Sequence, residues 1–149
     1  MKEKYIINND TVVVMSVSSS CSMVYELNCS FKVNCSLKKI INMSCNYFCS
    51  SFTGRIEGSK YYLGHSYKLP ILLDDYKNIV FFPLKSYRSI DNCIIFLNKI
   101  KDYKKCDNGI KILSINDKEI IINYSYPVFE NQYLRTQKLL MKIKYIKNI

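Results

Sequence analysis

The sequence predicts an α+β fold, in which a mostly antiparallel β-sheet built from hairpins is joined by two helices. Two observations lead to this prediction. Short apolar runs separated by turn-forming Asn, Asp and Gly residues follow one another through most of the chain, which is typical of hairpins. Two further segments, near residues 36–49 and 127–146, carry apolar residues at three- and four-residue spacing, which is typical of amphipathic helices. A chain of 149 residues has the length of one domain, so we expect a single unit over residues 1–149.

Strands are expected first near the N-terminus. Residues 5–7 and 11–17 flank the turn-favouring trio at 8–10, so they are predicted to form a hairpin. Residues 23–33 alternate between polar and apolar side chains, so they are predicted to form one continuous strand.

The pattern then changes to helical spacing. Apolar and small side chains recur at Leu37, Ile40, Ile41, Ser44, Cys45 and Phe48. Asn34 or Ser36 precedes them as a candidate N-cap, so a helix is predicted from about 36 to 49. Residues 50–55 are polar and contain a glycine, so they are predicted to form a turn.

Further hairpins are predicted in the second half of the chain. Residues 69–73 and 79–82 are almost continuously apolar, so we expect two central strands that are covered on both faces. Residues 93–97 form a short apolar strand that leads into a lysine-rich stretch. Residues 110–115 and 119–124 flank a polar turn and are predicted to form the last hairpin.

The C-terminal helix carries two separate lines of side chains. Pro127 is expected at the first helical position and Tyr126 just outside, because a residue before proline avoids helical geometry. The apolar stripe contains Phe129, Tyr133, Thr136, Leu140 and Ile143. A second line, at spacings of four, three and four, contains Asn131, Arg135, Lys138 and Lys142. This second line is either the solvated face of an ordinary surface helix or a surface that contacts phosphate groups.

The chain is strongly basic. Its 22 Lys and Arg residues against 12 Asp and Glu residues give a net charge of +10, which attracts polyanions such as nucleic acid or an anionic membrane surface. An AT-rich coding sequence would also enrich lysine, so charge alone does not choose a partner. No apolar run approaches the roughly 20 residues of a membrane span. The number of cysteines is odd and no convincing secretory signal occurs, so reduced thiols in a cytosol are the simpler account. We expect a cytoplasmic protein with no membrane partner.

Residue patterns that indicate an enzyme or a metal site are scarce. No phosphate-binding glycine loop, nucleophile elbow or metalloprotease motif occurs, and the single histidine, His65, is expected at the surface. Asp74 and Asp75 fit a hairpin turn better than a metal-binding pair. The seven cysteines include no Cys-x-x-Cys pair, which favours buried, reduced thiols over zinc ligands. We expect no catalytic residue, no metal and no cofactor.

Two stretches carry a recognisable order of motifs. The first contains Ser44-Cys45, an aromatic residue, Ser50-Ser51, a second aromatic residue and Gly54-Arg55. The second contains Ser125, Phe129-Glu130-Asn131-Gln132 and Arg135-Thr136. Lys68-Leu69-Pro70-Ile71 and Phe81-Phe82-Pro83 lie between them. In this order and spacing, the motifs resemble the competence transcription factor family, ComK, from about Lys39 to Met141.

The resemblance implies a bacterial activator that binds paired AT-rich boxes at DNA-uptake and recombination genes, through the minor groove and as an oligomer. The narrow minor groove of A·T tracts attracts Arg and Lys side chains. The candidate DNA-contacting residues are Arg55, Asn131, Arg135, Lys138 and Lys142. For Arg55, the alternative is that it caps the preceding helix or packs on Phe52. Double-stranded AT-rich DNA and a second copy of the chain are the expected partners.

The sequence departs from the family pattern at three places. Cys49 stands where the family has a glycine after the helix aromatic residue, and Ile94 stands where a tryptophan is usual. The longer C-terminal tail of relatives, which is associated with adaptor-mediated proteolysis, does not follow Ile149, so we do not expect control by that route.

Two other functions fit the same residues. The chain could be an interaction module that pairs with a full-length relative and modulates it. It could also be an unspecific nucleic-acid or membrane-surface binder that is driven by charge alone.

Overall fold

The computed structural model describes residues 2–64 and 67–147, so the expectation for His65 lies outside the described residues. The elements in chain order are β1 (Thr11–Ser18), β2 (Cys21–Glu26), β3 (Ser30–Val33), α1 (Leu37–Tyr47), α2 (Phe52–Leu63), β4 (Ile71–Asp74), β5 (Ile79–Pro83), β6 (Cys93–Phe96), the 3-10 turn η1 (Leu97–Lys99), β7 (Ile100–Cys106), β8 (Gly109–Ser114), β9 (Glu119–Ile122) and α3 (Tyr126–Lys147). The predicted α+β class, with its antiparallel hairpins and C-terminal helix, is confirmed.

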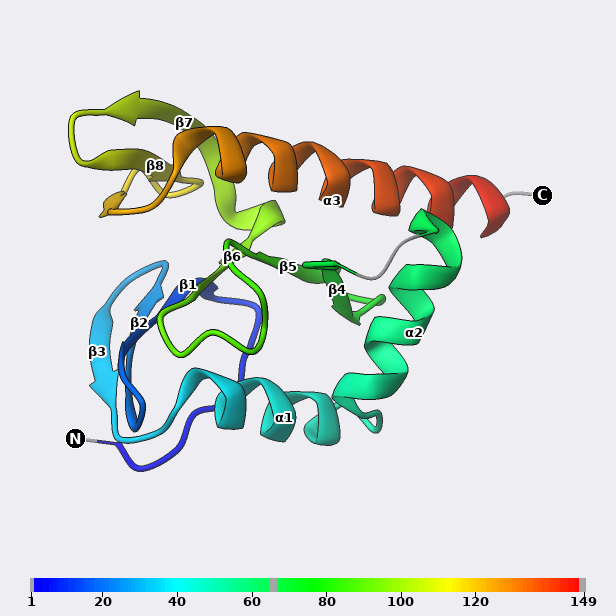
Figure 1. Cartoon of the computed structure of the whole chain (residues 1–149), viewed down its shortest axis with the longest axis horizontal. Helices are drawn as coiled ribbons and strands as arrows, with labels where there is room; N and C mark the ends of the chain where they lie inside the picture. The colour runs from blue at the N-terminus through cyan, green and yellow to red at the C-terminus, as the bar shows by residue number, and fades with distance from the viewer. Residues whose placement is uncertain (1, 65–66, 148–149) are drawn as a thin grey trace.

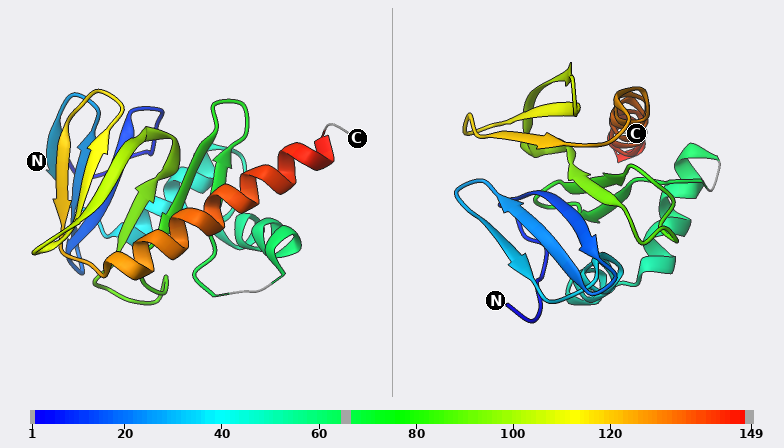
Figure 2. Two further views of the ribbon diagram at one scale, coloured as in Figure 1. Left: turned by 90° about the horizontal axis from the view of Figure 1, so that it is seen from above. Right: turned by 60° about the vertical axis from the view of Figure 1, so that its left-hand side comes forward.

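Two antiparallel sheets form the framework (Figure 1). Six strands pair in the order β3-β2-β1-β6-β5-β4, and three pair in the order β7-β8-β9. The helix α1 lies on one side of the larger sheet, and α3 and the smaller sheet lie on the other (Figures 1 and 2). The helix α2 runs along the β4 edge, from α1 to α3. The larger sheet is therefore a middle layer with both faces covered.

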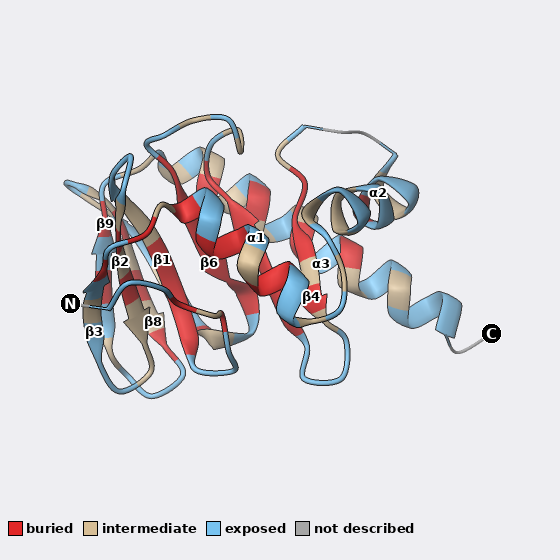
Figure 3. Cartoon of the chain, turned by 90° about the horizontal axis from the view of Figure 1, so that it is seen from below, coloured by how far each residue is buried: buried red, intermediate tan, exposed pale blue. Residues whose placement is uncertain are grey.

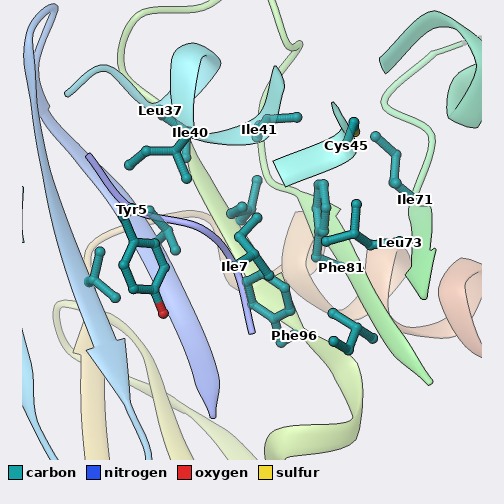
Figure 4. Close-up of a cluster of buried hydrophobic side chains, with 14 of the residues drawn as sticks. Tyr5, Ile7, Leu37, Ile40, Ile41, Cys45, Ile71, Leu73, Phe81 and Phe96 are labelled. Atoms are coloured by element: carbon teal, nitrogen blue, oxygen red, sulfur yellow. The ribbon is translucent and has the colours of Figure 1, made fainter. Parts of the chain in front are cut away.

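Two hydrophobic cores follow from this layering, because successive side chains of a strand point to opposite faces. Val14 and Phe81 lie in a core with α1, which we call the α1 core (Figure 4). Their neighbours Val13 and Phe82 lie in a second core with α3 and the smaller sheet, which we call the α3 core. The strands β5 and β6 are buried along their length and β1 over its first four residues (Figure 3), which explains the nearly continuous apolar runs in the sequence.

The start and the end of α1 are both fixed by local hydrogen bonds. The Ser36 hydroxyl accepts a bond from the Lys39 N–H at 3.1 Å, so Ser36 rather than Asn34 is the N-cap. At the other end, the N–H of Cys49 donates to the Asn46 carbonyl and the N–H of Ser50 donates to the Cys45 carbonyl, each at 3.0 Å. This Schellman pattern closes the helix at Tyr47, two residues before the predicted end.

The predicted turn at residues 50–55 is wrong, because α2 begins at Phe52. The Ser51 hydroxyl accepts a hydrogen bond from the Gly54 N–H at 3.0 Å and caps the helix. Two glycines lower the intrinsic helix propensity of this segment. Only Ser59 is fully buried, so the segment has no apolar stripe from which a helix could be predicted. Contacts with α1, β4 and α3 stabilise α2 in place of local propensity.

Several strand predictions need smaller corrections. Residues 23–33 are two strands, because the chain turns at 27–29, where the Glu26 N–H donates to the Cys29 carbonyl at 2.8 Å. Residues 5–7 form no strand, and the N–H of Ile7 donates instead to the Ser44 hydroxyl of α1 at 2.9 Å. The hairpin β4–β5 is confirmed, but β4 is an edge strand rather than a central one. The lysine-rich stretch after residue 99 forms β7.

The backbone conformation of Cys49 explains why the family pattern has a glycine at this position. Its backbone φ is +60°, in the left-handed region that a residue with a Cβ adopts at a cost. The side chain is exposed, so glycine would lose little packing there. We expect Cys49→Gly to raise the free energy of unfolding by about 0.5–1 kcal/mol, measured by urea denaturation. Cys49→Ala removes the thiol but keeps the Cβ, and an equal gain in that control would contradict the backbone explanation.

Candidate nucleic-acid interface

The helix α3 is the element on which most of the predicted contact residues lie. It runs across the outside of the molecule and packs on β5, on β8 and on the end of α2 (Figures 1 and 2). Its helical bonds begin with the Phe129 N–H to the Ser125 carbonyl, so the helix starts at Tyr126, one residue earlier than predicted.

The buried face of α3 differs from the predicted apolar stripe. The fully buried side chains are Phe129, Gln132, Thr136 and Leu139, whereas Tyr133, Leu140 and Ile143 are half-buried. The difference arises because α3 contacts two neighbours: Phe129 and Tyr133 face the α3 core, while Gln132 faces the chain that connects α2 to β4. A single apolar stripe could not reveal the second contact, since a polar side chain makes it.

Four successive backbone carbonyls between α2 and β4 each accept a hydrogen bond from a side chain elsewhere in the fold. We call this arrangement the carbonyl bracket. The bonds are Arg135 Nη2 to Tyr67 O at 2.8 Å, Gln132 Nε2 to Lys68 O at 2.8 Å, Tyr87 Oη to Leu69 O at 2.6 Å and Ser59 Oγ to Pro70 O at 2.5 Å. Gln132 Nε2 also donates to the Pro83 carbonyl at 2.7 Å. The bracket ties α3, α2 and the β5–β6 loop to one short segment.

Arg135 is a part of this bracket. Besides the Tyr67 carbonyl, its guanidinium donates to the Gln132 side-chain oxygen. Burial lowers the pKa of Arg135, and the nearby Tyr87 partly offsets that effect. The Lys68 pKa is lowered by burial and by repulsion from Arg135. Arg135 therefore has an internal structural role.

The other members of the predicted line differ in exposure. Lys142 Nζ donates to the Tyr62 carbonyl at 3.0 Å, near the end of α2, although its side chain stays exposed. Asn131 and Lys138 are exposed on α3. The same exposed side of the helix carries the large apolar side chains of Leu134, Met141 and Tyr145. We call this side, from Asn131 to Tyr145, the outer face of α3.

Arg55 lies apart from that line, in the first turn of α2. Its side chain is half-buried, and its Nε atom is buried without a hydrogen-bond partner among the described residues. Burial raises the pKa of the Cys45 thiol, and the positive charge of Arg55 partly offsets this rise, which places the guanidinium beside α1. Backbone N–H groups close the end of α1, so a capping role for Arg55 is not needed.

Ion pairs occupy several of the other lysines. Lys85 pairs with Asp91 at 2.9 Å, Lys101 with Asp117 at 2.8 Å and Lys111 with Glu119 at 3.4 Å, and Lys147 pairs with Asp75. Within residues 2–64 and 67–147, Lys138 has no such acidic partner. It is the member of the predicted line whose charge is most available to an external anion.

The cysteines are free thiols, three of them buried, two half-buried and two exposed. The expectation that they are buried thus holds for Cys35, Cys45 and Cys93. The part of the chain that is described contains no group of three or more His, Cys, Asp and Glu side chains suited to a metal ion. None of its helices combines the length and the apolar character that crossing a bilayer requires.

Most residues of the two motifs have a structural task. In the first motif, Cys45 is buried in the α1 core and Ser51 caps α2. In the second, Phe129 anchors the α3 core and Gln132 serves the bracket. Two residues of the second motif are exposed: Ser125, whose hydroxyl accepts a hydrogen bond from the Val128 N–H at 3.4 Å, and Asn131. Sequence reasoning missed Gln132, Tyr87 and Ser59, and the interior helical position of Gln132 was the one signal that could have indicated a buried role.

Comparison with known proteins gives a result consistent with these motifs. The family model described as ComK protein matches residues 2–147. The Competence transcription factor of Bacillus subtilis (strain 168) is 32% identical over 147 residues, which cover 95% of this chain and 76% of that protein. No solved structure matches the chain significantly. The chain belongs to the ComK family.

Proposed function

We propose that this protein is a DNA-binding activator of competence genes, which recognises AT-rich boxes through the minor groove. The observation that carries the proposal is membership of the ComK family, together with the relative named Competence transcription factor. A net charge of +10 suits a polyanionic partner. The narrow, negative minor groove of A·T tracts favours Arg and Lys contacts without base-specific hydrogen bonds.

The outer face of α3 is the surface we propose for DNA. Lys138 and Lys142 supply charge there, and Asn131 supplies an exposed amide for groove-edge hydrogen bonds. Leu134 and Met141 lie between them, and proteins that bend DNA at the minor groove insert apolar side chains of this kind. Arg135 supports this surface from within, because its half-buried guanidinium bonds to the Tyr67 carbonyl. Arg55 lies apart from the surface, at the start of α2 beside α1, and would contact DNA only as a separate point.

AT selectivity is the first expected result. A duplex with two spaced A/T boxes should bind more tightly than a GC-rich duplex of equal length, because its narrower minor groove carries the more negative potential, and both affinities should fall as salt is raised. Fluorescence anisotropy titrations at several salt concentrations measure both quantities. Equal affinity for the two duplexes would support an unspecific, charge-driven binder instead.

The contribution of Lys138 is separately measurable. If Lys138 contacts one phosphate, Lys138→Gln should flatten the slope of log K against log salt by about 0.9. Lys101→Gln is the matched control, since it also removes one exposed lysine but one that is paired with Asp117 on the smaller sheet. A slope that changes equally in both variants, or in neither, would mean that this face of α3 is only solvated.

The exposed apolar side chains on α3 also favour a second candidate, an interaction module that pairs with another copy or with a full-length relative. Leu134, Met141 and Tyr145 are all more than half exposed. Two-box DNA sites would themselves bring two copies together. Sedimentation with and without the AT-rich duplex separates these cases, because a module would associate with its relative in the absence of DNA.

A further inference from the structure

A cavity of about 440 Å³ opens on the α1 side of the larger sheet, far from the outer face of α3. It lies between the start of α1, the β1–β2 turn and the β5–β6 loop. Leu37 and Ile41 of α1, Phe52 of α2 and Ile90 of the loop supply apolar walls. Serine hydroxyls from β1, the β1–β2 turn, α1 and the loop supply polar ones. Its volume and mixed lining are those of a small-molecule pocket.

The charged residues that line this cavity all have one sign. Lys38 and Arg88 line it, both side chains are exposed, and none of its described lining residues is acidic. Ser36, the N-cap of α1, also lines it, so the positive end of the helix dipole lies at the rim. An apolar cavity with cations at its rim suits a ligand that has an apolar body and one anionic group.

The loop that forms one wall is fixed by a buried amide. Asn92 is 2% exposed, and its Oδ1 accepts the N–H groups of Lys85 at 2.9 Å and Cys93 at 2.8 Å. Its Nδ2 donates to the carbonyls of Lys85 at 3.0 Å and Ser86 at 3.1 Å. Tyr87, which is held by the carbonyl bracket, packs edge to face on Phe52 with ring centroids 4.9 Å apart. The cavity is therefore preformed, so binding needs little ordering of its walls.

We propose that this cavity binds a small amphipathic carboxylate. The apolar part of the ligand lies on Leu37, Ile41 and Phe52, and the carboxylate faces Lys38 and Arg88. The larger sheet separates this site from α3, so the proposal is independent of DNA binding. Its failure would leave the proposed function untouched.

Octanoate is a suitable probe, with octanol as its uncharged counterpart of equal chain length. We expect saturable one-to-one binding of octanoate by calorimetry, and at least tenfold weaker binding of octanol. In methyl NMR spectra, octanoate should shift the signals of Ile41 and Ile90, which line the cavity, and leave Ile122 of the α3 core unchanged. These signals locate the ligand without relying on any activity.

The charge contribution is tested with a double variant and a matched control. Lys38→Gln with Arg88→Gln should weaken octanoate binding about tenfold, since each exposed ion pair contributes a small factor. Lys32→Gln with Lys39→Gln removes the same charge from exposed residues that do not line the cavity, and binding should persist. Thermal melts confirm folding of both variants. Equal weakening in both, equal affinity for octanol, or no saturable shift of Ile41 would overturn the proposal.

Discussion

Replacement of Phe129 by Ala is expected to lower the free energy of unfolding by about 3–5 kcal/mol. The ring is fully buried and lies against Phe82 and Tyr103, with centroids 5.6 and 5.0 Å away. These neighbours belong to β5 and β7, so the ring joins α3 to both sheets. Truncation leaves a cavity between two sheets that cannot easily close around it. Urea denaturation followed by far-UV circular dichroism measures the loss.

Leu134→Ala on the same helix is the control for that measurement. Leu134 is 56% exposed, so its truncation should change stability by no more than about 0.5 kcal/mol. A domain of this size is stable by only about 5–15 kcal/mol, so the Phe129 variant should be partly unfolded on warming while the Leu134 variant is not. Comparable losses in the two variants would show that α3 is held by something other than the α3 core.

Gln132→Ala is expected to cost about 2–4 kcal/mol, because each buried acceptor that loses its donor costs about 1–3 kcal/mol. The Gln132 side chain is fully buried and serves the carbonyls of Lys68 and Pro83 at once. Its oxygen also accepts a hydrogen bond from Arg135. The change should loosen the connection between α2 and β4 as well as α3, and hydrogen exchange should quicken there.

Two variants separate the possible causes of the Gln132 effect. Gln132→Met keeps most of the volume but donates no hydrogen bond, so a loss that persists in it belongs to the unsatisfied carbonyls. Asn131→Ala alters the neighbouring exposed amide and should leave stability within about 0.5 kcal/mol. Full stability of the Met variant would mean that packing, not the bracket, is what Gln132 contributes.

The fold class could be predicted from the sequence because the hairpins and the amphipathic helices have local signals. The apolar runs of β5 and β6 are continuous because both faces of the larger sheet are covered, and this was foreseen for β5. The helix α2 could not be predicted, because it contains two glycines and its apolar periodicity is weak. Tertiary contacts stabilise it instead. The edge position of β4 depends on strand order, which local patterns do not contain.

The candidate interface was predictable only in part. The spacing of Asn131, Lys138 and Lys142 on one side of α3 follows from helical geometry, and all three are exposed. Arg135 has the same spacing but bonds to the Tyr67 carbonyl, which comes from a distant part of the chain. Helical periodicity predicts on which side of a helix a side chain lies, but it does not predict which other part of the chain packs against that side. A cationic side chain in a line of polar residues on a helix can therefore have a structural role, as Arg135 does, and need not contact DNA.

The position of α3 has a consequence for how the protein is made. Until α3 emerges from the ribosome, the face of the larger sheet that bears Val13 and Phe82 lacks part of its cover. The nascent chain then presents an apolar surface and unpaired carbonyls before residue 71, which invites aggregation or chaperone binding. Synthesis of α3 should thus increase the protease resistance of the chain, so that slow translation of this region would lower the yield of folded regulator.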